Sequence, residues 1–155
     1  MFNVVLVEPE IPPNTGNIGR LCLATGSTLH LVKPLGFSLD DRQLKRAGLD
    51  YWEEVPLQIW DSFDALRSAH SCGARYFFLT TKSRHPYYEI KFRKSDFLVF
   101  GRETKGLPNQ LLAANARNCV TIPMQGARSL NLATAVAIVL FEAVRQQSTA
   151  FCTDL

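Results

Sequence analysis

The sequence lacks the features that mark secreted, membrane-spanning or metal-binding proteins. Its cysteines form no C-x-x-C pair, and its three histidines have no metal-ligand spacing. The four cysteines are Cys22, Cys72, Cys119 and Cys152. No apolar run can span a bilayer, because the best candidate, residues 130–144, is short and contains Asn131, Thr134 and Glu142. We therefore expect a cytoplasmic protein with buried thiols at Cys22 and Cys119, no metal and no membrane segment.

Common nucleotide-binding and hydrolase motifs are also missing. There is no G-x-G-x-x-G, no G-x-x-x-x-G-K-[ST] and no G-x-S-x-G, which argues against a dinucleotide fold, a P-loop and a hydrolase elbow. The first ten residues have no basic leader, so we expect no secretory signal. A net charge of +3, from 17 basic and 14 acidic residues, does not by itself indicate nucleic-acid binding.

What is present is an alternation of strand and helix patterns along 155 residues, 46% of them hydrophobic. The expected strands are residues 2–8, 28–33, 57–60, 74–81, 95–101 and 119–123. The expected helices are residues 15–26, 38–48, 62–70, 108–116 and 129–144. Asn14 or Thr15, Ser38 and Ser129 are the expected N-caps, and Gly26 is expected to end the first helix. This alternation predicts one α/β domain, a parallel sheet flanked by helices.

Ligands of such sheets bind at the carboxyl ends of the strands. Three polar segments follow strands there, at residues 8–20, 100–108 and 120–131, and each carries an arginine. Gly16 and Gly19 in the first segment allow close approach of another backbone. The alternative is a capped helix with a surface arginine for the first segment, an ordinary polar loop for the second and simple helix capping for the third. Together they predict a pocket for a phosphate-bearing partner.

Residues 82–94, KSRHPYYEIKFRK, concentrate positive charge with a single acidic residue, Glu89. Tyr87, Tyr88 and Phe92 lie between the basic residues. Cations for phosphates and rings for bases are typical of an RNA-binding surface. The alternative is a solvated loop.

The segments PPNTGNIGR, FGRETKGLP and IPM…RSLNLATAVAI, in this order, resemble the three motifs of the SPOUT class of RNA methyltransferases. They resemble in particular the small tRNA 2′-O-methyltransferases that act on the wobble nucleotide. The resemblance implies a single methyltransferase domain over residues 1–155 and a C-terminal deep trefoil knot. It also implies S-adenosylmethionine as cofactor, a homodimer, and the anticodon loop of tRNA as partner.

The resemblance also implies roles for individual residues. The implied catalytic residues are Arg20, Glu103, Ser129 and Asn131. The implied cofactor-binding residues are Leu79, Thr80, Gly101, Glu103, Ile122, Met124 and Leu130. Since a guanidinium keeps its proton, Arg20 is expected to hold a phosphate and stabilise the developing alkoxide rather than act as a base. In the dimer either subunit could supply it. Gly19 and Arg102 depart from the family, in which a larger residue and a proline are common.

Three other functions remain open. The same chemistry could act on another tRNA position or on ribosomal RNA. A non-catalytic RNA-binding dimer could keep the fold, although it would have no need of all four polar residues. A flavodoxin-like small-molecule domain is disfavoured, because the loops contain no evident flavin-phosphate cradle.

Overall fold

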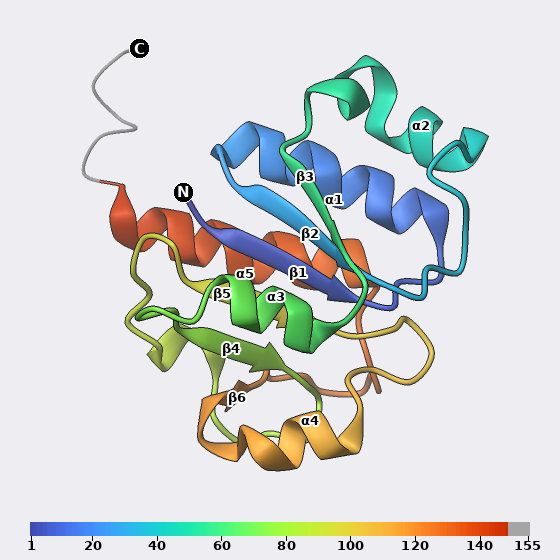
Figure 1. Cartoon of the computed structure of the whole chain (residues 1–155). Helices are drawn as coiled ribbons and strands as arrows, with labels where there is room; N and C mark the ends of the chain where they lie inside the picture. Colours follow the sequence, from blue (N-terminus) through green and yellow to red (C-terminus); the bar gives the residue numbers. More distant parts are fainter. Residues whose placement is uncertain (149–155) are drawn as a thin grey trace.

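The computed structural model describes residues 1–148 and consists of a six-stranded parallel sheet with helices on both faces (Figure 1). The strands are β1 (Asn3–Val7), β2 (Thr28–Val32), β3 (Leu57–Trp60), β4 (Tyr76–Leu79), β5 (Phe97–Phe100) and β6 (Cys119–Val120). The α-helices are α1 (Pro12–Thr25), α2 (Arg42–Gly48), α3 (Phe63–Ala69), α4 (Asn109–Ala114) and α5 (Leu132–Gln147). Short 3-10 helices are η1 (Leu49–Glu54), η2 (Tyr87–Glu89) and η3 (Ala116–Asn118). The order β3-β2-β1-β5-β4-β6, with every pairing parallel, confirms the predicted fold class.

Helices cover both faces of the sheet, so both faces are buried. Successive side chains of a strand point to opposite faces and therefore enter two different cores. Val4 and Leu6 of β1 pack into a core shared with α1 and α5. Val5 and Val7 pack into a second core, shared with α3 and α4. Cys22 and Cys119 are buried as predicted, whereas Cys152 lies outside the described residues.

Helix α1 begins earlier than its sequence pattern predicts. Its N-cap is Ile11, which offers no side-chain hydrogen bond, so the predicted caps Asn14 and Thr15 lie inside the helix. Two prolines at the start of the helix explain the shift, because proline is well suited to the first helical turn. Gly26 ends α1 in the left-handed conformation, as predicted (φ 62°).

The caps of α2 and α5 also differ from the predicted ones. Asp41, not Ser38, accepts from the backbone N–H groups of Gln43 (2.7 Å) and Leu44 (3.2 Å). Helix α5 starts after Asn131, whose Oδ1 accepts from the N–H of Thr134 (3.3 Å). Ser129 is therefore not a cap, because the helix begins three residues further along the chain.

Gly16 and Gly19 allow close approach as predicted, by backbone at Gly16 and by a side chain at Gly19. A Cβ on Gly16 would lie 2.4 Å from the carbonyl oxygen of Leu44, and one on Gly19 would lie 2.8 Å from the ring of Trp52. The two glycines therefore let α2 and η1 pack directly on α1. Within residues 1–148, no helix is long and apolar enough to cross a membrane.

Because His30 is buried, we expect the folded protein to lose stability in acid. Trp60 Nε1 donates to His30 Nδ1 (3.0 Å), which leaves the ring proton on Nε2, 3.0 Å from Asn3 Oδ1. Burial, and then the nearby His70, lower the pKa of His30 from 6.5 to about 4. Between pH 6.5 and pH 4, His30 is protonated in the unfolded chain but stays neutral in the folded protein. The free energy of unfolding should therefore fall by roughly 3 kcal/mol over this range.

Urea unfolding across this pH range measures the effect. His30→Gln should remove most of this pH dependence, whereas His85→Gln, at an exposed histidine, should leave it unchanged. Equal pH dependence in the wild-type protein and His30→Gln would contradict the assignment.

Candidate active site

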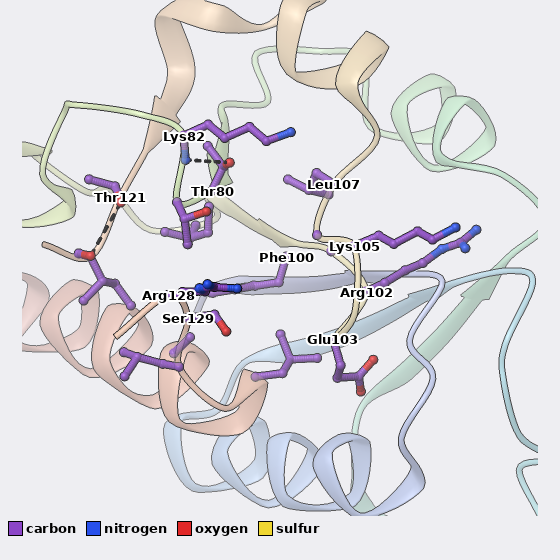
Figure 2. Close-up of a pocket in the computed structure, with 18 of the residues that line it drawn as sticks. Thr80, Lys82, Phe100, Arg102, Glu103, Lys105, Leu107, Thr121, Arg128 and Ser129 are labelled. Carbon is purple, nitrogen blue, oxygen red and sulfur yellow. Dashed lines mark hydrogen bonds between the residues drawn. The ribbon is translucent and has the colours of Figure 1, made fainter. Parts of the chain in front are cut away.

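A pocket of about 420 Å³ opens at the carboxyl ends of β4, β5 and β6 (Figure 2). Its walls come from the segments that follow these three strands, at residues 79–82, 100–107 and 121–132. Every residue predicted to bind the cofactor lines this pocket: Leu79, Thr80, Gly101, Glu103, Ile122, Met124 and Leu130. Ser129 also lines the pocket. Segments that are far apart in sequence thus form one site, because parallel strands end at the same edge of the sheet.

The loop after β5 folds back tightly on itself. The N–H of Gly106 donates to the carbonyl of Arg102 (2.9 Å), and the N–H of Arg102 donates to the carbonyl of Gly106 (3.2 Å). A Cβ on Gly101 would lie only 2.1 Å from the carbonyl carbon of Gly106, which itself has φ 66°. Both glycines are required by this turn, and the turn presents Glu103 to the neighbouring strand's loop.

Glu103 binds the start of helix α1. Its carboxylate oxygens accept from the backbone N–H groups of Glu10 (2.8 Å) and Ile11 (3.0 Å) and from Asn14 Nδ2 (3.4 Å). The helix has no side-chain cap of its own, so Glu103 supplies the negative charge that a helix N-terminus favours. The carboxylate therefore holds the site together.

Asn14 extends this contact to the third segment. It is 6% exposed, and its Oδ1 accepts from Asn131 Nδ2 (3.0 Å). Glu103, Asn14 and Asn131 thus form a hydrogen-bonded chain through all three polar segments. The sequence patterns pointed to Asn14 only as a cap, because neither its burial nor its partners can be read from the local sequence.

Arg20 does not line this pocket. With Asn131 it lines a second groove, of about 740 Å³, on the exposed side of α1 and α5. Asn131 does not line the first pocket either, but its chain neighbours Leu130 and Leu132 do, so the pocket and the groove are adjacent. The structure therefore brings Glu103 and Ser129 to the pocket, but places Arg20 in the adjacent groove.

The other two arginines of the polar segments differ in their contacts. Arg102 forms an ion pair with Glu8, and Thr104 Oγ1 donates to Glu10 (2.7 Å), so this loop is tied to the loop after β1. Arg128 lies beside Ser129 in the pocket (Figure 2) and forms no ion pair within residues 1–148. It is a pocket residue that the predicted set omitted. Among the described residues, no group of histidine, cysteine and carboxylate side chains could hold a metal.

The arrangement matches a known family. A profile of the SpoU rRNA Methylase family matches residues 1–141. The chain belongs to this family. A tRNA (cytidine(34)-2′-O)-methyltransferase from Methylovorus glucosotrophus (strain SIP3-4) is 51% identical over 152 residues, which cover 97% of this chain and 98% of the relative. The predicted resemblance is thus confirmed.

Solved structures agree with the sequence match. One, described as "Structural insights into the 2-OH methylation of C/U34 on tRNA", has a TM-score of 0.90 and 48% identity, and covers 95% of this chain and 96% of that one. An AdoMet-bound rRNA methyltransferase from Sinorhizobium meliloti has a TM-score of 0.83 and 31% identity. The second match covers 93% of this chain and 56% of that one. The shared fold is therefore that of RNA methyltransferases.

The capping role of Glu103 predicts a stability defect on its replacement. Glu103→Gln keeps one acceptor oxygen and loses the charge, so the free energy of unfolding should fall by about 2 kcal/mol. Urea unfolding at neutral pH measures the change. Glu54→Gln, the same substitution at an exposed position, should have almost no effect; an equal loss in both variants would refute the cap.

Proposed function

We propose that this protein transfers the methyl group of S-adenosylmethionine to the ribose 2′-hydroxyl of the wobble nucleotide of tRNA, a cytidine or a modified uridine. One observation carries the proposal: the segments after β4, β5 and β6 form a single pocket next to the groove of Arg20. Membership of the SpoU methylase family and the names of the relatives support the same chemistry.

The pocket suits S-adenosylmethionine in size and lining. Its volume of about 420 Å³ falls in the range of small-molecule sites, which are mostly apolar with a few placed polar groups. Leu79, Ile122 and Leu130 would supply apolar walls for the cofactor, and Thr80 and the backbone of the Gly101 loop would supply polar groups. The cofactor brings an activated methyl group bonded to a positively charged sulfur.

The protein's part in the reaction is to align the ribose and stabilise its oxygen. Bound S-adenosylmethionine would supply the methyl group to the ribose oxygen, and the hydroxyl proton would be released to solvent. Ser129, at the pocket, positions the hydroxyl together with Asn131, which the chain to Asn14 and Glu103 holds in place. Arg20 holds the adjacent phosphate and favours the developing negative charge on the oxygen.

We further propose a homodimer in which the partner subunit's Arg20 completes each pocket. The groove of Arg20 is largely apolar, and Tyr51 (48% exposed) borders it. On α5, Phe141 is 47% exposed. A second copy of the chain that covers α1 and α5 would bury these side chains and bring Arg20 to the other subunit's pocket.

The remaining proposals concern the whole chain. We propose that residues 1–155 are one methyltransferase domain that works in the cytoplasm, where tRNA is available. We also propose that its C-terminal part forms a deep trefoil knot. Support for the knot comes from the segment between β6 and α5, which shares the pocket with the Gly101 loop before the chain returns to pack on α1.

Methylation of bulk tRNA tests the reaction and its site together. The purified protein is incubated with labelled S-adenosylmethionine and tRNA, and the methylated nucleoside is identified and located by mass spectrometry. We expect a 2′-O-methylated pyrimidine at the wobble position. Label only at another tRNA position, or no label in tRNA while the cofactor binds, would refute the proposed substrate, and failure to bind the cofactor would refute the chemistry.

Arg20→Ala should lower turnover at least a hundredfold, as loss of a transition-state contact does, and leave binding of S-adenosylhomocysteine nearly unchanged. Calorimetry and single-turnover rates measure the two effects, with Arg117→Ala as a control at another exposed arginine. Mixing Arg20→Ala with Ser129→Ala subunits should restore activity, because one site of each mixed dimer is then intact. Lost cofactor binding in folded Arg20→Ala, or no restoration on mixing, would contradict this arrangement.

A further inference from the structure

The connection between β4 and β5 runs the length of the sheet and joins two cavities. Residues 80–96 leave the carboxyl end of β4 and return to the amino end of β5. Residues 80–82 line the candidate cofactor pocket. Residues 93–96 line another cavity, of about 630 Å³, at the amino ends of the strands.

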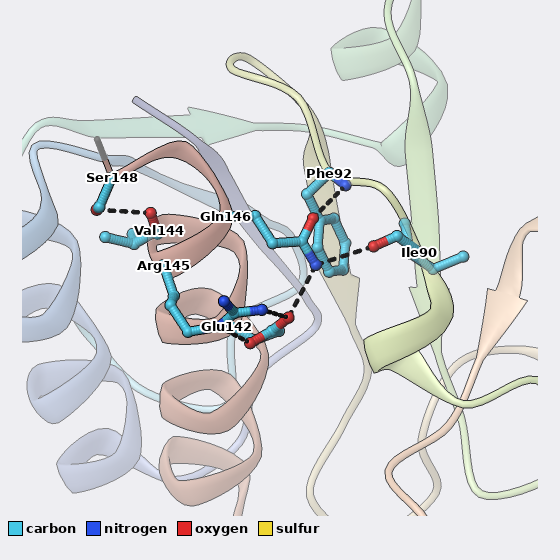
Figure 3. Close-up of polar contacts among 7 residues, drawn as sticks. All are labelled: Ile90, Phe92, Glu142, Val144, Arg145, Gln146 and Ser148. Atoms are coloured by element: carbon cyan, nitrogen blue, oxygen red, sulfur yellow. Dashed lines mark hydrogen bonds and ion pairs between the residues drawn. The ribbon is translucent and has the colours of Figure 1, made fainter. Parts of the chain in front are cut away.

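Helix α5 holds this connection in place (Figure 3). Gln146 Nε2 donates to the carbonyl of Ile90 (3.0 Å), and Gln146 Oε1 accepts from the N–H of Phe92 (2.9 Å). Gln147 Nε2 donates to the carbonyl of Phe92 (2.7 Å). Glu142 in turn accepts from Gln146 Nε2 (2.8 Å) and forms an ion pair with Arg145. The extended backbone around Phe92 is therefore fixed against a long helix.

The aromatic side chains of the connection between β4 and β5 mostly face inward. This corrects the prediction that these rings are available to RNA bases. Phe92 is 3% exposed and packs edge-on against Phe77, with 5.5 Å between ring centroids. Tyr87 packs against the core of the α5 face, and only Tyr88 is largely exposed, at 55%. The outer surface of this connection therefore offers few rings on which bases could stack.

The basic side chains face outward. We define the basic ridge as the exposed residues Lys82, Arg84, Lys91, Arg93 and Lys94. Lys91 and Arg93 flank the buried Phe92, so the alternation of an extended chain turns both toward solvent. Within residues 1–148, Arg84, Lys91, Arg93 and Lys94 form no ion pair, and the one acidic residue between them, Glu89, lies 3.6 Å from His85.

At the far cavity the positive charge comes from Arg93 and Lys94. Arg75, which also lines it, is already paired with the buried Asp96 (3.1 Å) and donates to the carbonyl of Lys91 (3.0 Å). That pair holds the end of the ridge in shape, and neither Arg93 nor Lys94 forms an ion pair within residues 1–148, so the cavity keeps a net positive charge. An unneutralised concave surface of this kind attracts anions.

We infer that the basic ridge binds the sugar–phosphate backbone of the substrate tRNA, whose anticodon stem lies along residues 82–94 toward the far cavity. The inference rests on the proposed function, which puts the reacting nucleotide at the pocket where the ridge begins. Five exposed cations with one largely exposed ring, Tyr88, fit a paired stem, because double-stranded RNA is bound through its phosphates and shape rather than by stacking. The ridge thus orients the tRNA without reading its sequence.

Salt-dependent tRNA binding tests the ridge. The variant Lys91→Gln/Arg93→Gln/Lys94→Gln removes three charges that lie away from the pocket. The slope of log Kd against log salt should fall by about two, and affinity at low salt should fall on the order of tenfold. The matched control Arg42→Gln/Lys45→Gln/Arg46→Gln makes the same charge change on α2 and should alter the slope much less.

Binding of S-adenosylhomocysteine separates this inference from the proposed function. If the wild-type protein binds the cofactor product and tRNA while the ridge variant keeps its salt slope, the ridge does not bind RNA. Equal losses in the ridge and α2 variants would likewise overturn the inference, since net charge alone would then explain them. If the wild-type protein binds neither ligand, the proposed function itself fails.

Discussion

The candidate site depends on one carboxylate at the start of one helix. Helix α1 begins without a side-chain cap, and Glu103, 93 residues away from Glu10 in sequence, accepts from the N–H groups of Glu10 and Ile11 just before the helix. Because a helix N-terminus favours negative charge, this contact stabilises both the helix and the loop that carries Glu103. Asn14 donates to Glu103 and accepts from Asn131, so one continuous set of hydrogen bonds joins the three polar segments.

This constraint explains why the site is composed as it is. The loop after β5 can present Glu103 only because Gly101 and Gly106 allow it to close on itself. Asn131 serves α5 and the site at once, since its Oδ1 caps the helix while its Nδ2 binds Asn14. The polar start of an apolar helix is thereby accounted for: the first residues face the pocket and groove, and the following residues enter the core.

The glycines of α1 illustrate how a local pattern can predict a close approach without identifying the partner. Gly16 and Gly19 indicated a close approach near the site, and the approach exists. What approaches is the backbone of α2 and the ring of Trp52, not a ligand. Similarly, the three arginines of the polar segments have three different environments: Arg102 is paired with Glu8, Arg128 lies in the pocket and Arg20 lies in the groove.

The sequence by itself determined the alternation of elements, the parallel sheet, the buried thiols and the set of residues at the pocket. The elements, the sheet and the buried thiols follow from local hydrophobic patterns, whereas the individual pocket residues follow from the motifs shared with the SPOUT class. Only the tertiary structure decided which residue caps each helix, that Glu103 binds backbone, and that Arg20 stands apart from the pocket. The reason is physical: the deciding hydrogen bonds, such as that of Asn131 to Asn14 across 117 residues, join segments whose relative positions no local pattern contains.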